Sequence, residues 1–146
     1  MSVSKKKIEK VTIVVNLISI ACSLLIIGAI CIWAPVCSGT LELANGNMTP
    51  MRCLYTGKVA ILMSIVLIAV SLASMASKRP FTVPVIALSL ALMLLVVETP
   101  VSIGVCKSSE MACWSTAAWI VGCGGMSAIS ALVGFILNPE RKRIQA

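Results

Sequence analysis

The stretch VTIVVNLISIACSLLIIGAICIWAP, residues 11–35, contains no charged side chain and is rich in isoleucine, valine, leucine and alanine. An α-helix rises about 1.5 Å per residue, so this run is long enough to cross the roughly 30 Å hydrocarbon core of a bilayer. The chain of 146 residues is 59% hydrophobic and 12% charged, and a soluble domain of this size leaves too much surface exposed to bury that fraction. The stretch therefore predicts a transmembrane helix.

Three further apolar runs follow, at residues 59–77, 81–105 and 113–137, and the only charge within them is Glu98. The segment 78–80 between two of these runs is very short, so the helices on either side of it must be antiparallel neighbours. We therefore predict an all-α membrane protein, a four-transmembrane-helix bundle. Its single domain, 1–146, is expected to have helices at about 11–35, 59–77, 81–105 and 113–137, and outer loops at 36–57 and 106–112.

Basic residues gather on one side of the predicted spans. Nine of the twelve lysines and arginines precede the first helix, lie between the second and third, or follow the fourth. The positive-inside rule then predicts cytoplasmic N- and C-termini for a plasma-membrane protein, with both cysteine-bearing loops outside. The net charge of +7 is explained by this topology and by contact with anionic membrane lipid, so no nucleic acid is expected as a partner. The first run is longer than a signal-peptide core and is expected to stay uncleaved.

The two outer loops resemble each other. The first has VC at 36–37 and MRCLYT at 51–56, and the second has VC at 105–106 and MACWST at 111–116. The shared pattern is V-C, a spacer and M-x-C-x-x-T, with one cysteine at the end of an outgoing helix and the other at the start of a returning one. This pattern predicts two helix–loop–helix hairpins related as a pseudo-repeat. The alternative is coincidence between segments of similar membrane composition.

Four of the seven cysteines, Cys37, Cys53, Cys106 and Cys113, are expected at the outer surface. An oxidising exterior favours disulfides there. The repeat favours Cys37–Cys53 and Cys106–Cys113, one disulfide for each hairpin, although four cysteines allow three pairings. The other three cysteines are expected to pack as small apolar residues within helices: Cys22, Cys31 and Cys123.

Two chemical roles for the outer cysteines remain open. The layout is similar to that of bacterial disulfide-generating membrane proteins that pass electrons to quinone, although this chain has no C-x-x-C. Soft donors at Met51, Cys53, Met111 and Cys113 suit copper(I). The chain has no histidine, which excludes a Ser/His/Asp triad and histidine ligands for a metal or haem. We therefore expect neither an enzyme nor a bound cofactor.

Polar and small residues within the spans are further candidates. Glu98 is costly inside a bilayer and predicts a polar notch that faces the bundle interior or a partner. Asn16 is expected to form a hydrogen bond across helices. Small residues spaced along the last span allow close approach of another helix, within the bundle or on a partner. They are Gly124, Gly125, Ala128, Ala131 and Gly134.

The loop motifs carry a resemblance to a known family. PVC at 35–37, MRCLYTG at 51–57, IGVC at 103–106 and MAC at 111–113 resemble a family of small bacterial four-helix membrane proteins of unknown function. Members often have Pro-Val-Cys after the first helix and Met-Lys-Cys-His-Tyr/Trp-Thr before the second. This chain has Leu54 where many members have histidine, which weakens any metal or redox role that needs that histidine.

The resemblance implies a companion role beside permeases of the MacB/FtsX type, the ABC transporters with a large extracellular domain. The leading hypothesis is therefore a small integral membrane accessory subunit that packs against a larger permease or against copies of itself. Disulfides would make its outer surface rigid. Thiol–disulfide redox chemistry is the first alternative and copper(I) handling the second.

Overall fold

Four helices and one small β-hairpin make up the part of the chain that the computed structural model describes. The described residues are 2–37, 40–42, 46–50, 52–77, 81–97 and 112–137. The helices are α1 (Ser2–Gly28, continued by a π-helical turn at Ala29–Trp33), α2 (Arg52–Ser77), α3 (Thr82–Val96) and α4 (Ala112–Ile136), and the strands are β1 (Thr40–Glu42) and β2 (Met48–Pro50).

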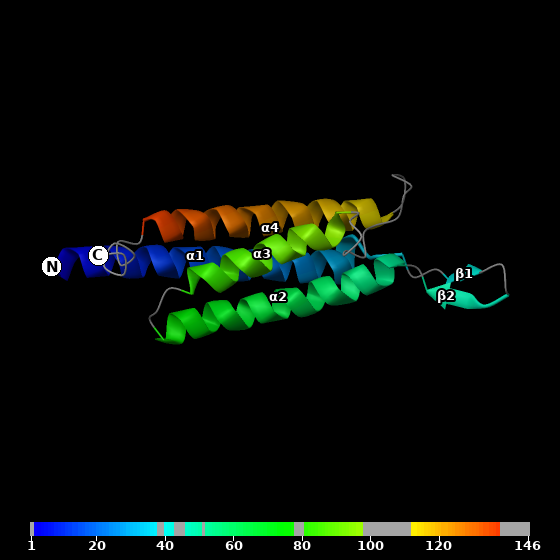
Figure 1. Cartoon of the computed structure of the whole chain (residues 1–146), viewed down its shortest axis with the longest axis horizontal. Helices are drawn as coiled ribbons and strands as arrows, with labels where there is room; N and C mark the ends of the chain where they lie inside the picture. Colours follow the sequence, from blue (N-terminus) through cyan, green and yellow to red (C-terminus); the bar gives the residue numbers. More distant parts are fainter. Residues whose placement is uncertain are drawn as a thin grey trace.

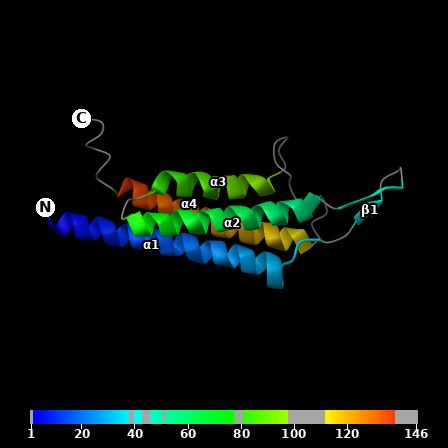
Figure 2. The same cartoon turned by 90° about the horizontal axis from the view of Figure 1, so that it is seen from below.

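The helices form an antiparallel bundle, in which each runs against the direction of the one before it (Figure 1). Helix α1 contacts both α2 and α4, and α3 contacts both α4 and α2. The β-hairpin projects beyond one end of the bundle in both views (Figures 1 and 2). We call this the hairpin end, where α1 ends and α2 and α4 begin. The opposite end is called the far end.

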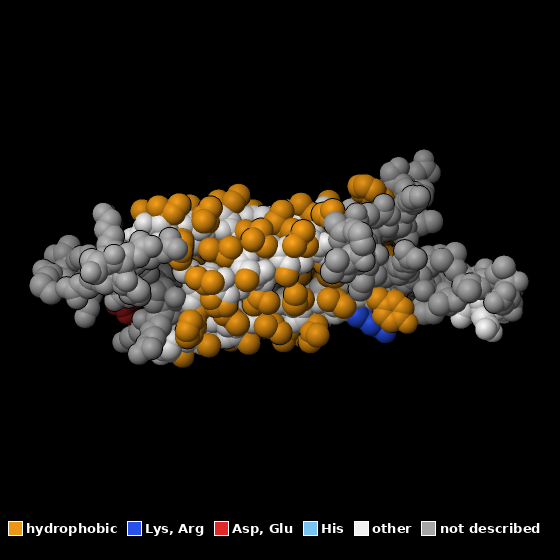
Figure 3. Space-filling model, viewed as in Figure 1, with side chains coloured by type: hydrophobic (Ala, Val, Ile, Leu, Met, Phe, Trp, Pro, Cys, Tyr) orange, Lys and Arg blue, Asp and Glu red, His pale blue; other side chains and the backbone are white. Residues whose placement is uncertain are grey.

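Three helical segments are long and apolar enough to span a membrane: Glu9–Trp33, Cys53–Ser77 and Cys113–Ile136. Hydrophobic side chains cover the middle of the bundle face seen in Figure 3, and charged side chains appear only toward its two ends. Because so much apolar surface faces outward, the chain is a membrane protein rather than a soluble bundle.

Helix α3 is shorter than the predicted span 81–105. Its 15 residues extend roughly 22 Å, less than the hydrocarbon core. The backbone is already extended at Val97. The sequence has a proline at position 100, and a helix continued to that position would lack the N–H that bonds the carbonyl of Val96 and would bring the proline ring against that carbonyl. The predicted Glu98 site lies outside the described residues.

The first outer loop also differs from the predicted boundaries 36–57. Helix α2 begins at Arg52 rather than near 59, so most of the MRCLYT motif is helical. Strands β1 and β2 pair antiparallel, with Leu41 opposite Thr49. Gly46 lies between them with φ +75°, a left-handed conformation that favours glycine. The all-α prediction therefore holds for the bundle and missed this hairpin.

The buried faces of α2 and α4 have the same register. Every buried position of α2 has a buried counterpart sixty positions later in α4, and the positions are spaced by mostly three or four residues, as in helices packed at small crossing angles. The pairs are Cys53/Cys113, Thr56/Thr116, Gly57/Ala117, Ala60/Ile120, Ser64/Gly124, Leu67/Ser127, Ser71/Ala131 and Ser74/Gly134.

Candidate functional site

The two M-x-C-x-x-T motifs meet at the hairpin end. Cys53 is the second residue of α2 and Cys113 is the second residue of α4, and each side chain is only 1% exposed. Both line one apolar cavity of about 10 Å³, roughly the space that one water molecule needs. Its lining residues are Val36, Cys53, Thr56, Gly57, Cys113, Thr116, Ala117 and Ile120.

Cys37 lies beside both of these cysteines. The Cys53 thiol donates a hydrogen bond to the carbonyl oxygen of Cys37 across 3.6 Å. The Cys113 thiol lies near enough to the Cys37 thiol to raise its pKa. Three of the four predicted outer cysteines therefore lie close together at the hairpin end.

Desolvation makes the Cys37 thiol a weak acid. Burial raises the pKa of this thiol above its ordinary value, while the backbone hydrogen bond from Cys113 lowers the pKa. The nearby Cys113 and Cys53 thiols add to the rise. Because a higher pKa means a smaller thiolate fraction, Cys37 is a poorer nucleophile than an exposed cysteine.

The structure does not support the predicted Cys37–Cys53 disulfide. Cys37, Cys53 and Cys113 are all free thiols, and the Cys53 sulfur faces a backbone oxygen of Cys37 rather than its sulfur. Cys106, the predicted partner of Cys113, lies outside the described residues. The three cysteines placed within helices by the sequence are also free thiols: Cys22, Cys31 and Cys123.

Further contacts hold the end of α1 against α4 at the same level. Thr116 donates a 2.5 Å hydrogen bond to the carbonyl of Ala34, just past the π-helical turn. Trp33 and Trp119 meet edge to face, with ring centroids 5.7 Å apart. The sequence indicated Thr116 only as part of the repeated M-x-C-x-x-T motif. It gave no sign that α1 would end in a π-helical turn.

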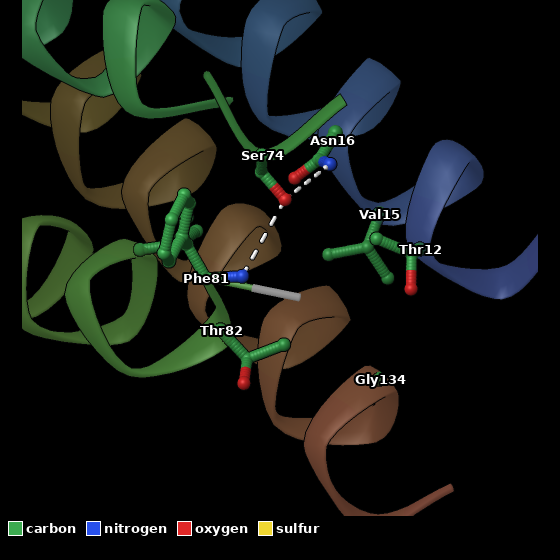
Figure 4. A pocket seen from close by; sticks show the side chains of 8 residues that line it. Thr12, Val15, Asn16, Ser74, Phe81, Thr82 and Gly134 are labelled. Atoms are coloured by element: carbon green, nitrogen blue, oxygen red, sulfur yellow. Dashed lines mark hydrogen bonds between the residues drawn. The ribbon is translucent and has the colours of Figure 1, made fainter. Parts of the chain in front are cut away.

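A second small cavity lies at the far end (Figure 4). Asn16 is 3% exposed and donates a 3.0 Å hydrogen bond from its side-chain amide to the Ser74 hydroxyl. The Ser74 hydroxyl also accepts the backbone N–H of Phe81 at 3.4 Å. Asn16 thus links α1 to the end of α2 and the start of α3, which is the kind of cross-helix bond that the sequence predicted for it.

Serine hydroxyls connect three helices between the two cavities. Ser89 donates to Ser127 at 3.0 Å, and Ser127 donates to Ser19 at 3.1 Å. Ser64 and Ser71 on α2 are buried and have no hydrogen-bond partner within the described part of the chain. Sequence reasoning missed these serines, and the available signal was their spacing of seven positions, which puts Ser64 and Ser71 on one helix face.

The predicted small-residue interface of α4 divides into two sets. Ala131 is fully buried, and a Cβ on Gly124 or Gly134 would approach Met93 to 3.2 Å or Val15 to 3.0 Å. These three residues serve contacts inside the bundle. Gly125 and Ala128 are half-buried. Gly122 is exposed. A Cβ atom added to Gly122 or Gly125 would have no described atom within 4 Å, apart from the nearby backbone of α4 itself.

A metal role gains no support from the described ranges. Within them, no group of three or more histidine, cysteine, aspartate or glutamate side chains is arranged to hold an ion. Met51 and Met111, the thioether donors predicted for copper(I), lie outside the described residues, so that prediction is untested.

Comparison with known proteins finds a family match over most of the chain. Residues 10–137 match a protein family described as a domain of unknown function (DUF4418). No curated protein and no solved structure matches the chain significantly.

Proposed function

Since the chain belongs to the DUF4418 family, which carries no assigned function, we propose its function from the structure and from its motifs. The protein is a small non-enzymatic membrane subunit that packs against a larger membrane permease or a second copy of itself. The resemblance of its loop motifs favours a permease of the MacB/FtsX type. It works without a cofactor, in contact with lipid over most of its apolar surface.

The observation that carries this proposal is the unused face of α4. Gly122 and Gly125 leave open space beside the helix within the described part of the protein, and Ala118 one turn before Gly122 is also exposed. In a membrane, small residues let a second helix approach closely and gain van der Waals contact. The bundle already uses Gly124 and Gly134 for its own contacts, so this outward set is free for a partner helix.

Charge supports the proposed orientation. Helices α1 and α3 begin and α2 and α4 end at the far end. The basic segment 5–7 lies near the start of α1, and the segments 78–79 and 141–143 follow α2 and α4 along the chain. The positive-inside rule then favours a cytoplasmic far end, a plasma-membrane location and an external hairpin end.

The register of the buried faces supports the proposed pseudo-repeat. If α1 with α2 and α3 with α4 are two copies of one hairpin, equivalent helices bury equivalent positions. Helices α2 and α4 do so at an offset of sixty residues. Within this repeat, Cys53 corresponds to Cys113 and Thr56 to Thr116.

Co-purification tests the proposal. The full chain, tagged and extracted from native membranes in mild detergent, is expected to bring down a larger membrane protein or to run as a dimer. Gly122→Leu with Gly125→Leu fills the open face and should reduce the captured partner at least tenfold. Ala87→Leu, at an exposed position of α3, is the matched control and should retain it.

Two results would count against the proposal. One is a wild-type protein that stays monomeric and captures no partner. The other is a double variant that folds, retains its helical circular dichroism and binds the partner as well as the wild type does. The second result would move the interface away from α4.

Thiol–disulfide redox chemistry is the second candidate, and the convergence of Cys37, Cys53 and Cys113 favours it. The raised pKa of Cys37 weighs against it, because exchange proceeds through the thiolate. Alkylation trapping in cells would detect a pair that cycles between reduced and oxidised forms, and a pair permanently in one form would exclude this role.

A further inference from the structure

The amphipathic aromatic side chains of the protein all lie at the hairpin end. The chain has three tryptophans and one tyrosine, and they come from three helices. Trp33 ends the π-helical turn after α1, Tyr55 lies in the first turn of α2, and Trp114 and Trp119 lie near the start of α4. Each is between 39% and 49% exposed, so part of each ring packs on the bundle and part faces outward. Such residues concentrate where a bilayer meets water, because the ring is apolar and its N–H or O–H is polar.

The heights of these rings along the helices match the boundary of a bilayer. Tyr55 and Trp114 each lie 22 positions before the last residue of their helix, which is about 33 Å along the helix axis and close to the thickness of the hydrocarbon core. Trp119 lies about 7.5 Å deeper than Trp114 along α4, and its ring meets that of Trp33 at 5.7 Å. The four side chains therefore straddle the boundary between headgroups and acyl chains, with the Trp33–Trp119 pair on its inner side.

An exposed lysine accompanies these rings on α2. Lys58 lies three positions after Tyr55, so both are on one face of the helix, and both are exposed. Side chains of an α-helix tilt toward its N-terminus, which for α2 is the hairpin end. This tilt carries the Lys58 ammonium out of the hydrocarbon toward the level of Tyr55, while its apolar stem stays along the helix. Figure 3 shows basic side-chain atoms at this margin of the apolar surface.

We propose that the hairpin end carries a phospholipid-binding surface, in which the four aromatic side chains lie at the headgroup boundary and Lys58 binds a lipid phosphate. The phosphate accepts hydrogen bonds from the Lys58 ammonium and the Tyr55 hydroxyl, and anionic lipids are preferred because the surface presents a positive charge. The far end has none of these four aromatic residues, so the two membrane boundaries are anchored by different chemistry. This proposal rests on membrane insertion alone and does not depend on the partner proposed above.

Depth-dependent fluorescence quenching tests the placement of the aromatic side chains. The full chain is reconstituted in phosphatidylcholine vesicles whose acyl chains carry bromine atoms either close to the glycerol or close to the methyl end. Three single-tryptophan variants, in which the other two tryptophans are changed to phenylalanine, separate Trp33, Trp114 and Trp119. In each variant the shallow bromines should quench at least twofold more than the deep ones, and Trp114 should show the largest ratio.

Two results of this experiment would overturn the placement. One is stronger quenching by the deep bromines. The other is weak quenching by both lipids with strong quenching by aqueous iodide, which would put the rings in water. Circular dichroism checks that each variant is helical, and the wild-type chain gives the average over its three tryptophans if a variant does not fold.

Lipid selectivity tests the role of Lys58. Vesicles that mix brominated phosphatidylglycerol with unlabelled phosphatidylcholine report which lipid lies beside the tryptophans. The wild type should prefer phosphatidylglycerol, and Lys58→Gln should lower this preference by roughly threefold, because one basic side chain near an anionic surface contributes only a few-fold in binding. Lys10→Gln is the matched control, since Lys10 is exposed on α1 at the far end, and it should leave the preference unchanged. An equal preference in the Lys58→Gln variant and the wild type would overturn the contact with a lipid phosphate.

Discussion

The two ends of the bundle are built alike but held by different chemistry. At each end a glycine packs closely against a valine. Gly134 of α4 meets Val15 of α1 at the far end, and Gly57 of α2 meets Val36, just after α1, at the hairpin end. A Cβ atom added to either glycine would lie 3.0 Å from the valine side chain. Each end also has a cavity of about 10 Å³. The same close approach therefore recurs at both ends.

The polar groups beside these contacts differ. The far end uses an amide, a hydroxyl and a backbone N–H, centred on Ser74. The hairpin end uses three thiols and one threonine hydroxyl. Hydrogen bonds between helices in a membrane contribute only about 0.6 kcal/mol on average, whereas thiols can be joined covalently. Among the described contacts at the two ends, only those at the hairpin end involve a thiol.

Filling the glycine at either end should have the largest effect. Gly57→Leu and Gly134→Leu place new atoms where Val36 or Val15 already lies, and such overpacking typically costs about 1–3 kcal/mol. Reversible unfolding in detergent, followed by circular dichroism, measures the free energy of unfolding. Val36→Ala should partly rescue only Gly57→Leu, and Val15→Ala only Gly134→Leu. Equal rescue by either valine variant would show that the two ends are not separate contacts.

Removing a hydroxyl between the two ends should have an intermediate effect. Ser127→Ala removes two inter-helix bonds, those with Ser89 and Ser19, and should lower the free energy of unfolding by about 1 kcal/mol. Ser71→Ala is the matched control, since its hydroxyl has no partner in the described part of the chain. That variant should be neutral or slightly stabilising. Equal losses from both variants would contradict the observed network.

The smallest effects are expected from single polar bonds at each end. Asn16→Ala and Thr116→Val should each cost about 0.6 kcal/mol. They should differ in a second measurement, the rate at which maleimide labels Cys37 in the reduced protein. Thr116→Val loosens the end of α1 and should increase this rate, whereas Asn16→Ala should leave it unchanged. A faster rate in the Asn16 variant would show that the ends are coupled.

Much of the fold could be predicted from hydropathy, with errors at particular residues. The predicted end of the last span, 113–137, lies within one residue of α4, because a long uncharged run in lipid has to be helical to satisfy its backbone. The third span was predicted to reach residue 105 because its apolar residues continue beyond Val96, whereas the described helix α3 ends at Val96. The second helix was predicted to begin too late because Arg52 and Lys58 interrupt the apolar run.

The candidate site was predicted less completely. Motif spacing correctly indicated that Cys53 and Cys113 occupy equivalent helix starts, and it favoured pairing within each hairpin. It contained no information on which thiol the exit of α1 would meet. That depends on how α1 docks between α2 and α4, and the Thr116 bond to Ala34 is a contact between residues 82 positions apart.

The sequence by itself determined the membrane character, the number of helices and the resemblance between the two cysteine motifs, because these follow from local composition and spacing. Only the tertiary structure decided which small residues remain open, which serines are connected and that the Cys53 thiol meets the carbonyl of Cys37. Helix faces meet according to the fit of side chains from distant parts of the chain, such as Gly134 against Val15. The order of residues along the chain does not reveal this side-chain packing, because it depends on which helices come together.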